Sequence, residues 1–271
     1  MTQNDSTDQL TRELSVAVMS CDRYGDLWPH FFHFFEKNWP DCPFRVYLCT
    51  NHRAFDHGTV QVVPVGDDLS WAHTTREFML RIPTPYVLIL QDDFFLAKRV
   101  RTEAVLDYLR ILKELKGVYL RLRADFPPDT RIPGFPAVGR IEPGTPYRVA
   151  NQASIWNRET FLSLLKEGET AWDMELLGSR RSDVLVDGFY ASRRPVFFYP
   201  VTGVVKRGKW IRKWVRVCTK EGLAVDLRAR PMMTVFQDMT SRNGALIYPF
   251  VDRLPPKWRS QLIGWVRRRG W

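Results

Sequence analysis

Histidine and cysteine are scarce in this chain of 271 residues, and their positions exclude several kinds of site. The five histidines all lie before residue 74, and the four cysteines stand at positions 21, 42, 49 and 218. No two cysteines form a C-x-x-C pair, and no group of Cys and His has the spacing of a zinc site. The sequence therefore offers no zinc-binding motif.

Long apolar runs are also missing. No stretch is long enough to span a bilayer as a helix, and the polar start MTQNDSTDQLTRE lacks the apolar core of a signal peptide. We therefore expect a cytoplasmic protein in a reducing compartment.

Acidic residues are outnumbered, with 30 Asp and Glu against 40 Lys and Arg, so the formal net charge is +10. A positive balance of this size favours an anionic partner, which can be nucleic acid, a phosphate-bearing small molecule or an anionic membrane. Hydrophobic residues make up 45% of the chain, enough for a substantial core. The sequence thus predicts a folded protein with an anionic partner.

Strand and helix patterns alternate through the first half of the chain. We expect a disordered lead-in over residues 1–13 and then strands at 14–21, 44–51, 60–66 and 86–91, with helices at 27–39 and 72–82. Such alternation predicts an α/β fold, a mostly parallel sheet with helices on both faces. Ligands of these sheets bind beyond the carboxyl ends of the strands. All four ends are polar here: CDRYGD, CTN, GDDLSW and QDD.

The second half continues the same pattern with one long interruption. We expect a helix over 102–116, a strand over 118–124, a Pro- and Gly-rich loop over 125–148, and a strand over 148–157. A helix over 158–168 and a strand over 195–205 follow. No internal repeat or linker marks a second domain. We therefore predict one domain over residues 14–250, followed by a basic tail over 251–271.

The stretch YVLILQDDFFL places two adjacent carboxylates, Asp92 and Asp93, between apolar segments that look buried. Charged groups are costly to bury unless they are paired or bind a metal. Two interpretations remain open: a binding site at the end of the strand, or a turn in which a carboxylate pairs with Arg99 or Arg101. The apolar flanks on both sides favour a site.

Five segments in this order resemble the GT-A class of nucleotide-sugar glycosyltransferases: SCDRYGDLWP, the Trp71 region, YVLILQDDFFL, NQASIWNRETF and AWDMELLGS. They are most similar to small bacterial enzymes of polysaccharide and lipopolysaccharide biosynthesis. The resemblance covers roughly residues 15–210. It implies a GT-A-like (Rossmann-like) fold and transfer of a sugar, with inversion, from a nucleotide-sugar donor to a glycan or lipid-linked acceptor.

The resemblance also implies a divalent cation, Mg²⁺ or Mn²⁺, at the donor diphosphate. Carboxylates suit these hard cations, so Asp93 is expected as a metal ligand, with Asp92 beside it facing the donor. Gln91 replaces the first Asp of the family's usual triplet. The chain also lacks the late histidine that many members use as a ligand, which puts strict metal dependence in doubt. Lys206, Arg207 and Lys209 are cations in that region that could neutralise the leaving diphosphate directly.

An inverting transfer needs a carboxylate that takes the proton of the acceptor hydroxyl. The family places this base at the start of a helix on the acceptor side, where AWDMELLGS offers Asp173 and Glu175. We prefer Glu175, with Asp173 second. The alternative is that both are acidic residues of a first helical turn, favoured by the helix dipole.

Further site residues follow from the resemblance. For the donor nucleotide they are Asp22, Arg23, Tyr24, Thr50, Asn51, Ser70, Trp71, Gln91, Arg207 and Lys209. For the acceptor they are Gln152 and Trp156. Packing in the core is an equal alternative for both Trp71 and Trp156.

Basic residues interleaved with tryptophan fill two late segments, 206–216 and 253–271, which hold six basic residues each and no acid. Trp and Leu beside Lys and Arg suit an amphipathic helix on anionic lipid, so we expect peripheral binding to the inner face of the cytoplasmic membrane. A nucleic-acid-binding module is the rival class, although no such motif is present. A third possibility is a non-catalytic scaffold with a transferase fold.

Overall fold

A computed structural model describes residues 3–123, 126–200 and 202–238. The described residues form two compact units: the first holds 3–92, 96–123 and 126–199, and the second holds 93–95, 200 and 202–238. The sequence pattern predicted one domain over 14–250, with no boundary at residue 93. The tail over 251–271 lies outside the described residues.

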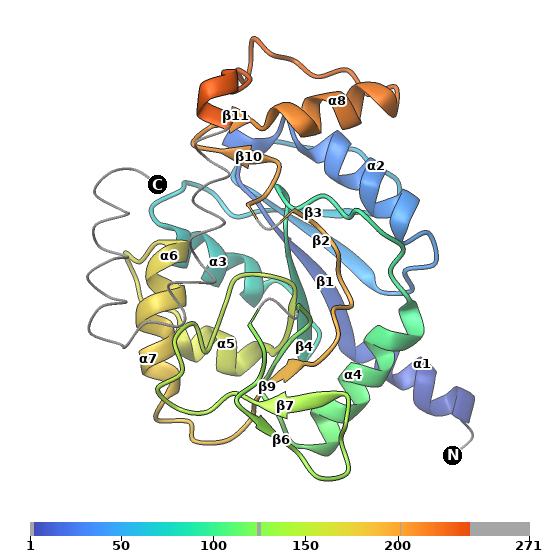
Figure 1. The fold of residues 1–271 in the computed structure, drawn as a ribbon, viewed down its shortest axis with the longest axis vertical. Helices are drawn as coiled ribbons and strands as arrows, with labels where there is room; N and C mark the ends of the chain where they lie inside the picture. Colours follow the sequence, from blue (N-terminus) through green and yellow to red (C-terminus); the bar gives the residue numbers. More distant parts are fainter. Residues whose placement is uncertain (1–2, 124–125, 201, 239–271) are drawn as a thin grey trace. The chain divides into compact units, whose positions relative to one another are not determined.

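The first unit is an α/β sandwich around a nine-stranded sheet with the order β3-β2-β1-β4-β8-β5-β9-β7-β6 (Figure 1). The strands are β1 (Leu14–Met19), β2 (Arg45–Thr50), β3 (Gln61–Pro64), β4 (Tyr86–Gln91), β5 (Tyr119–Arg121), β6 (Thr130–Arg131), β7 (Val138–Arg140), β8 (Ser154–Asn157) and β9 (Phe189–Ser192). β1 to β4 are all parallel. β8 runs antiparallel to both β4 and β5. The predicted α/β class is confirmed.

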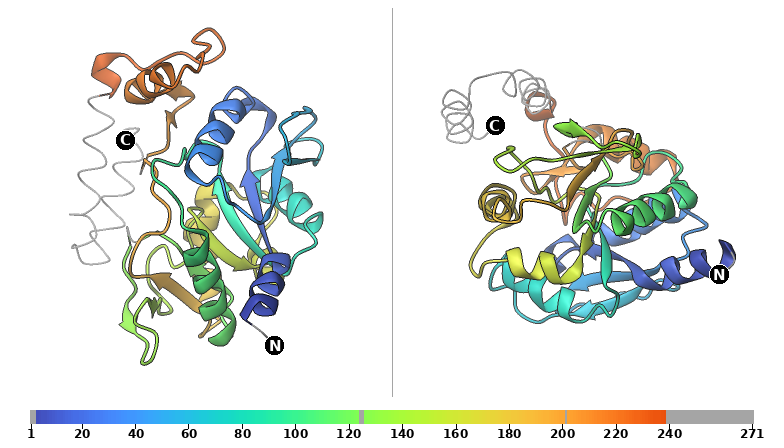
Figure 2. Two further views of the ribbon diagram at one scale, coloured as in Figure 1. Left: turned by 90° about the vertical axis from the view of Figure 1, so that its right-hand side faces the viewer. Right: turned by 90° about the horizontal axis from the view of Figure 1, so that it is seen from below.

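Helices cover both faces of this sheet (Figure 2). They are α1 (Gln3–Glu13), α2 (Trp28–Asn38), α3 (Trp71–Leu80), α4 (Thr102–Glu114), α5 (Arg158–Leu164), α6 (Ala171–Asp173) and α7 (Ser179–Ser182), with a π-helical turn η2 (Met174–Gly178) between the last two. Side chains at Ser70, Asn157 and Thr170 cap the amino ends of α3, α5 and α6. Such caps satisfy N–H groups that have no partner within the helix.

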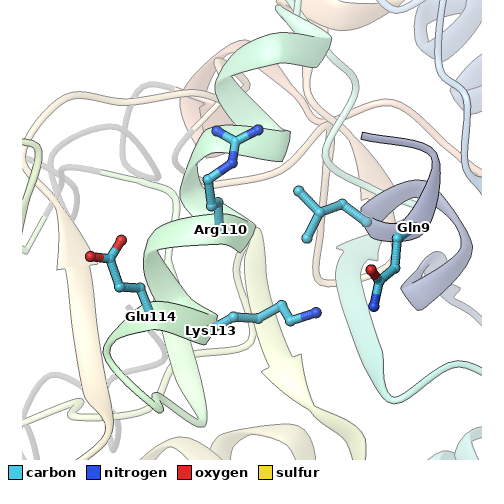
Figure 3. Close-up of a pocket in the computed structure, with 5 residues that line it drawn as sticks. Gln9, Arg110, Lys113 and Glu114 are labelled. Carbon is cyan, nitrogen blue, oxygen red and sulfur yellow. The ribbon is translucent and has the colours of Figure 1, made fainter. Parts of the chain in front are cut away.

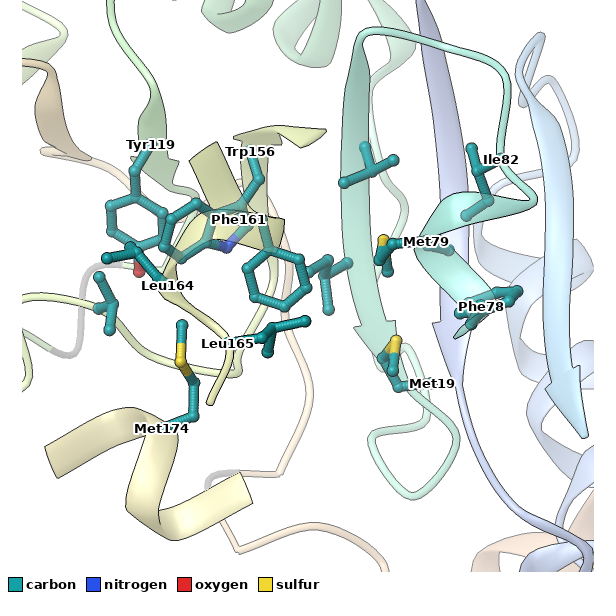
Figure 4. Packing of buried hydrophobic residues seen from close by; sticks show 14 of the residues in the cluster. Met19, Phe78, Met79, Ile82, Tyr119, Trp156, Phe161, Leu164, Leu165 and Met174 are labelled. Carbon is teal, nitrogen blue, oxygen red and sulfur yellow. The ribbon is translucent and has the colours of Figure 1, made fainter. Parts of the chain in front are cut away.

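The core on one face of the sheet joins α3, α5 and the strands (Figure 4). Trp156 is 1% exposed and lies 4.4 Å from the ring centre of Tyr119 and 5.0 Å from that of Phe161. The expectation that Trp156 stacks on an acceptor sugar is therefore wrong. On β8 the side chain of Trp156 points into the sandwich, and aromatic packing there accounts for its presence.

Two segments differ from the sequence-based expectation. Helix α1 occupies the predicted disordered lead-in, and its Leu10 is buried. The predicted strand over 195–205 is wrong, because β9 lies earlier and residues 193–200 are irregular. Pro195 and Pro200 lack the N–H that a sheet ladder requires. Phe197 in this segment is nevertheless fully buried. The apolar pattern of the segment therefore indicates burial, not a β-strand.

The second unit contains a hairpin of β10 (Val205–Lys206) and β11 (Lys209–Trp210), followed by helix α8 (Arg212–Lys220). Phe95 belongs to this unit and packs edge-on against Trp210 and Trp214, with ring centres 6.1 and 5.8 Å apart. Both tryptophans are buried. They thus form the core of the unit.

Candidate functional site

The carboxyl ends of β1, β2, β3 and β4 meet at one edge of the sheet because the four strands are parallel. The chain goes from β1 to β2 on one side and later to β4 on the other side. This reversal makes the gap between β1 and β4 a topological switch point, where open α/β sheets bind ligands. The residues that follow β1 and β4 are therefore the first to consider.

Asp92 follows β4 at this switch point and is joined to the end of β1. Ser20 donates a short hydrogen bond to Oδ2 of Asp92, and the indole Nε1 of Trp28 donates to Oγ of Ser20 at 2.6 Å. Asp92 is only 5% exposed. The carboxylate is thus held in a fixed direction by a hydrogen-bonded chain, and no Arg is needed to explain its burial. Arg99, one of the proposed partners in a salt-bridged turn, instead pairs with Asp41 at 3.0 Å.

Asp22 follows β1 and organises the loop after β2. Its carboxylate accepts hydrogen bonds from the backbone N–H groups of Asn51, His52 and Arg53 at 2.8–3.2 Å. Burial raises the pKa of Asp22, but these three donors outweigh it and the pKa lies below its ordinary value. Each oxygen accepts two bonds, so the carboxylate of Asp22 holds the loop after β2 in place, and its role at the donor nucleotide stays a prediction.

Other predicted donor residues lie at the same edge but are engaged in local structure. Asn51 accepts from the N–H of Asp22 and donates to Gly66 O at 3.0 Å each. Ser70 accepts from the N–H of His73 as the cap of α3, and the half-buried Trp71 packs against the core. Thr50 is fully buried. Arg23 is exposed and Tyr24 is half-buried in the turn after β1.

Asp68 is a carboxylate at this edge that sequence reasoning did not select. It accepts a hydrogen bond from Oγ1 of Thr74 at 3.0 Å. Burial and the negative charges of Asp92 and Asp68 raise the pKa of the Cys21 thiol, since both carboxylates lie near it. The GDDLSW segment after β3 carried the signal, as one of the four polar strand ends.

Gln91 and Glu175 are connected through Asn151, a residue that the sequence analysis missed. The side-chain amide of Gln91 donates to the carbonyl oxygen of Asn151 at 3.0 Å, and the N–H of Asn151 donates to Oε1 of Glu175 at 2.8 Å. The side chain of Asn151 also donates to the carbonyl oxygen of Ala171 at 2.7 Å. Asn151 thereby fixes the segment that carries Glu175 to the strand end that precedes Asp92.

Asp173 and Glu175 have different environments. Asp173 forms a capping box with Thr170: Oδ2 accepts from the N–H and hydroxyl of Thr170, and Thr170 Oγ1 accepts from the N–H of Asp173. Glu175 lies in the π-helical turn, a feature that is frequent at functional sites. Gly178 leaves room for the buried side chain of Met174, because a Cβ there would lie 2.5 Å from Sδ of Met174. The structure thus gives Asp173 a capping role and leaves Glu175 as the better candidate base. Gln152 is half-buried next to Asn151.

Asp93 belongs to the second unit. Its carbonyl oxygen accepts from the N–H of Val204 at 2.7 Å, and a Cβ on Gly203, whose φ is 72°, would lie 2.8 Å from Oδ2 of Asp93. Burial raises the pKa of Asp93 to about 7, against the lowering effects of a backbone N–H and of Arg230. A carboxylate with so perturbed a pKa is a functional-site candidate. Asp92 and Asp93 lie in different units, so their joint role stays a prediction.

The β10–β11 hairpin carries the three predicted cations. Arg207 is exposed at its tip with φ of 53°, a left-handed conformation that is uncommon outside glycine. Lys209 donates to Oε1 of Gln237 at 3.4 Å. Burial and the charge of Arg207 lower the pKa of Lys206. Non-glycine residues in this conformation cluster at functional sites.

Few of the described side chains could act as ligands of a divalent cation. Within the described ranges, no group of three or more His, Cys, Asp or Glu side chains could hold a metal ion. Mg²⁺ is commonly bound by one or two carboxylates together with substrate phosphates and water. The residues present fit that kind of site, with Asp92 or Asp93 as protein ligand, and do not form a complete protein cage.

A separate pocket of about 230 Å³ lies between α1 and α4, lined by Gln9, Leu10, Arg110, Lys113 and Glu114 (Figure 3). It lies at the amino end of β1, away from the strand ends that carry the candidate site.

None of the described helices is long and apolar enough to cross a membrane.

No family model and no curated protein matches this chain. Among solved structures, residues 1–349 of S. aureus TarS are similar at 10% identity, with a TM-score of 0.47 over 70% of this chain and 60% of that one. The same protein in complex with UDP-GlcNAc is similar at 10% identity, with a TM-score of 0.48 over 69% of this chain and 58% of that one. Mannosyl-3-phosphoglycerate synthase from Rubrobacter xylanophilus is similar at 13% identity, with a TM-score of 0.36 over 58% of this chain and 57% of that one. The chain therefore spans less than two thirds of each of these structures, and with TM-scores below 0.5 the likenesses carry no argument about function.

Proposed function

We propose that this chain is a glycosyltransferase that moves a sugar, with inversion, from a nucleotide-sugar donor to a glycan or lipid-linked glycan acceptor of bacterial surface polysaccharide biosynthesis. The proposal rests on the resemblance of its motifs to the GT-A class. One structural observation supports it most: the hydrogen-bonded connection from Gln91 through Asn151 to Glu175. It ties a candidate base to the switch point where the buried Asp92 stands.

Sugar transfer requires one site with a donor end and an acceptor end. At the donor end, we assign Asp92, whose carboxylate Ser20 holds by a hydrogen bond, to the donor diphosphate. Asp92 or Asp93 would hold a divalent cation, which would neutralise the diphosphate. Arg207 and Lys209 belong to the second unit, and positive charge for the leaving group stays their predicted role.

At the acceptor end, Glu175 takes the proton of the acceptor hydroxyl while that oxygen forms a bond to the anomeric carbon. The bond between this carbon and the diphosphate oxygen breaks at the same time, and the nucleoside diphosphate leaves with the bonding electrons. Attack from the face opposite the leaving group inverts the anomeric configuration. The N–H of Asn151 orients the carboxylate of Glu175 for this step.

The decisive experiment replaces Glu175 by Gln, which preserves the hydrogen bond from Asn151 but cannot accept a proton. A positioned base contributes about 10²–10⁴-fold to rate, so turnover should fall by that factor. Donor affinity should stay nearly unchanged. Release of nucleoside diphosphate from a panel of UDP-, GDP- and dTDP-sugars measures both, with a membrane lipid extract as acceptor.

Asp173→Asn is the matched control, because Asp173 is an acidic residue two positions away with a capping role. It removes an acidic charge from the first helical turn, so it should lower stability by about 0.3–1 kcal/mol and change turnover little. If Asp173→Asn abolishes turnover and Glu175→Gln does not, the two roles are exchanged. If no nucleotide sugar binds or reacts, the chain is not a glycosyltransferase, and a scaffold with this fold takes its place.

A further inference from the structure

The outer face of α8 carries three exposed cations, Lys213, Arg216 and Lys220. Their spacing of three and then four residues places them on one side of the helix. Trp214 and Cys218, on the other side, are buried at 7% and 0% exposure. Helix α8 (Figure 1) is therefore anchored in the second unit by its apolar side, and its other side presents a row of positive charge.

The acid nearest to this row in sequence is Glu221, which caps the carboxyl end of the helix. Helix α8 itself contains no acid, and no ion pair with a described residue involves any of the three cations. The nearby Asp226 instead accepts from the backbone N–H groups of Arg228 and Ala229. Like charges one helical turn apart repel each other. The helix dipole favours Lys220, which lies in the last turn, but it does not account for Lys213 and Arg216, so the row as a whole points to an anion outside the protein.

Exposed apolar side chains stand beside the start of the same helix. Val235 is 59% exposed and Phe236 is 76% exposed. Their segment is attached to α8 through Arg212, whose Nη1 donates to the carbonyl oxygen of Met233 at 3.2 Å, and through the contact of Lys209 with Gln237. Cations and a protruding Phe thus occur together in the second unit.

We propose that these five residues, Lys213, Arg216, Lys220, Val235 and Phe236, form a surface that docks on anionic phospholipid. We refer to them as the α8 surface. The cations contact the headgroups, while Phe236 and Val235 enter the boundary between headgroups and acyl chains, as in other interfacial segments with Lys or Arg beside Phe or Leu. This docking does not depend on sugar transfer, and it involves residues that precede the basic tail.

Single-stranded nucleic acid fits the α8 surface less well. Proteins that bind it combine a basic groove with aromatic side chains on which bases stack. The tryptophans interleaved with the basic residues, Trp210 and Trp214, are 1% and 7% exposed and cannot stack on bases. A membrane surface needs only the exposed charges and the protruding Phe.

The test is sedimentation of the full chain with vesicles of equal parts phosphatidylcholine and phosphatidylglycerol, and with vesicles of phosphatidylcholine alone. The wild type should bind the anionic vesicles only, and less as salt rises. Each basic residue near such a surface is worth roughly 1 kcal/mol, so Lys213→Gln, Arg216→Gln and Lys220→Gln together should weaken binding about 100-fold. Phe236→Ser should weaken it further.

The matched control replaces three exposed cations of the first unit, Lys116, Arg131 and Lys166, by Gln. It lowers the net charge equally and should retain wild-type binding. Equal losses in both triple variants would show that overall charge, not the α8 surface, binds the vesicles. Unchanged binding in the α8 variant would overturn the proposal, as would wild-type protein that ignores anionic vesicles but binds single-stranded DNA through these residues. Thermal melts of all variants establish that each one is folded.

Discussion

At the scale of single residues, Ser20 holds the candidate site together because it joins Trp28 to Asp92. Both partners are buried, at 1% and 5% exposure. Ser20→Ala removes one hydrogen bond from each of them, and buried groups that lose a partner cost about 1–3 kcal/mol. We expect the free energy of unfolding in urea to fall by that amount.

Ser163→Ala is the control, since Ser163 donates only to a carbonyl oxygen one turn earlier on an exposed part of α5. Its effect should stay within about 0.5 kcal/mol. Equal effects of the two substitutions would mean that the Trp28–Ser20–Asp92 chain adds no stability.

The residues of the candidate site divide by how they can be recognised in sequence. Gln91, Asp92 and Glu175 were predicted because a carboxylate or amide at a strand end or helix start is conspicuous. Ser20 and Asn151 were not, because their partners lie 72 and 24 residues away in the chain. Asn151 acts largely through its backbone N–H and carbonyl groups, which every residue type has, so no side-chain pattern marks it.

At the scale of elements, α1 is attached to α4 by a salt bridge and hydrogen bond between Glu13 and Lys113. Burial raises the pKa of Glu13, but the bonds from Lys113 and Gln9 outweigh it, so the pKa lies below its ordinary value of 4.5. A lowered pKa stabilises the fold above pH 4.5, and this stabilisation is lost as pH falls through the folded-state pKa. Glu13→Gln should therefore cost about 0.2–1 kcal/mol at neutral pH and progressively less below pH 4.5.

Denaturant unfolding at a series of pH values measures this difference. Glu114→Gln serves as the control, because Glu114 is exposed on α4 and lines the same pocket as Lys113; at neutral pH it should change the free energy of unfolding by less than about 0.5 kcal/mol. A constant difference between wild type and Glu13→Gln at all pH values would contradict the assigned ion pair.

The elements show where a local pattern is insufficient. The buried strands β1 and β4 were predicted because their runs of apolar residues are short and bounded by polar ones; β4 has the predicted limits, and β1 ends at Met19, two residues before the predicted end. Helix α1 was missed because its sequence is polar, while the burial of Leu10 and the bond of Glu13 to Lys113 depend on residues distant in sequence. Trp156 was assigned to the acceptor because no local feature distinguishes a tryptophan in the core from one in a site.

At the scale of the whole molecule, a ligand that binds only the folded state raises its stability. A nucleoside diphosphate at a hundred times its dissociation constant should add about 2.7 kcal/mol. For a chain of this size that corresponds to roughly 5–10 °C in melting temperature. We expect one of UDP, GDP, CDP or dTDP to produce this shift with Mn²⁺ and a smaller one with EDTA.

AMP at the same concentration controls for unspecific binding of phosphate to a chain with a net charge of +10. Equal shifts with Mn²⁺ and EDTA would favour the hairpin cations over a metal ion. The absence of any shift would contradict nucleotide binding at this edge of the sheet.

The division into two units could not be predicted from the sequence, because residues 93–95 join the second unit through contacts distant in sequence rather than through a linker.

The π-helical turn over Met174–Gly178 makes the site sensitive to chain length as well as to residue identity. Its hydrogen bonds join residues five positions apart, whereas those of an α-helix join residues four positions apart. The turn therefore accommodates one extra residue. Deletion of Leu176 would let the segment continue as a regular α-helix, and the fold would survive. The residues on either side of the deletion would keep their phase in one α-helix, but the widened turn in which Oε1 of Glu175 accepts from the N–H of Asn151 would be lost. A descendant of this protein can therefore lose its chemistry through one missing codon while every proposed site residue is still encoded.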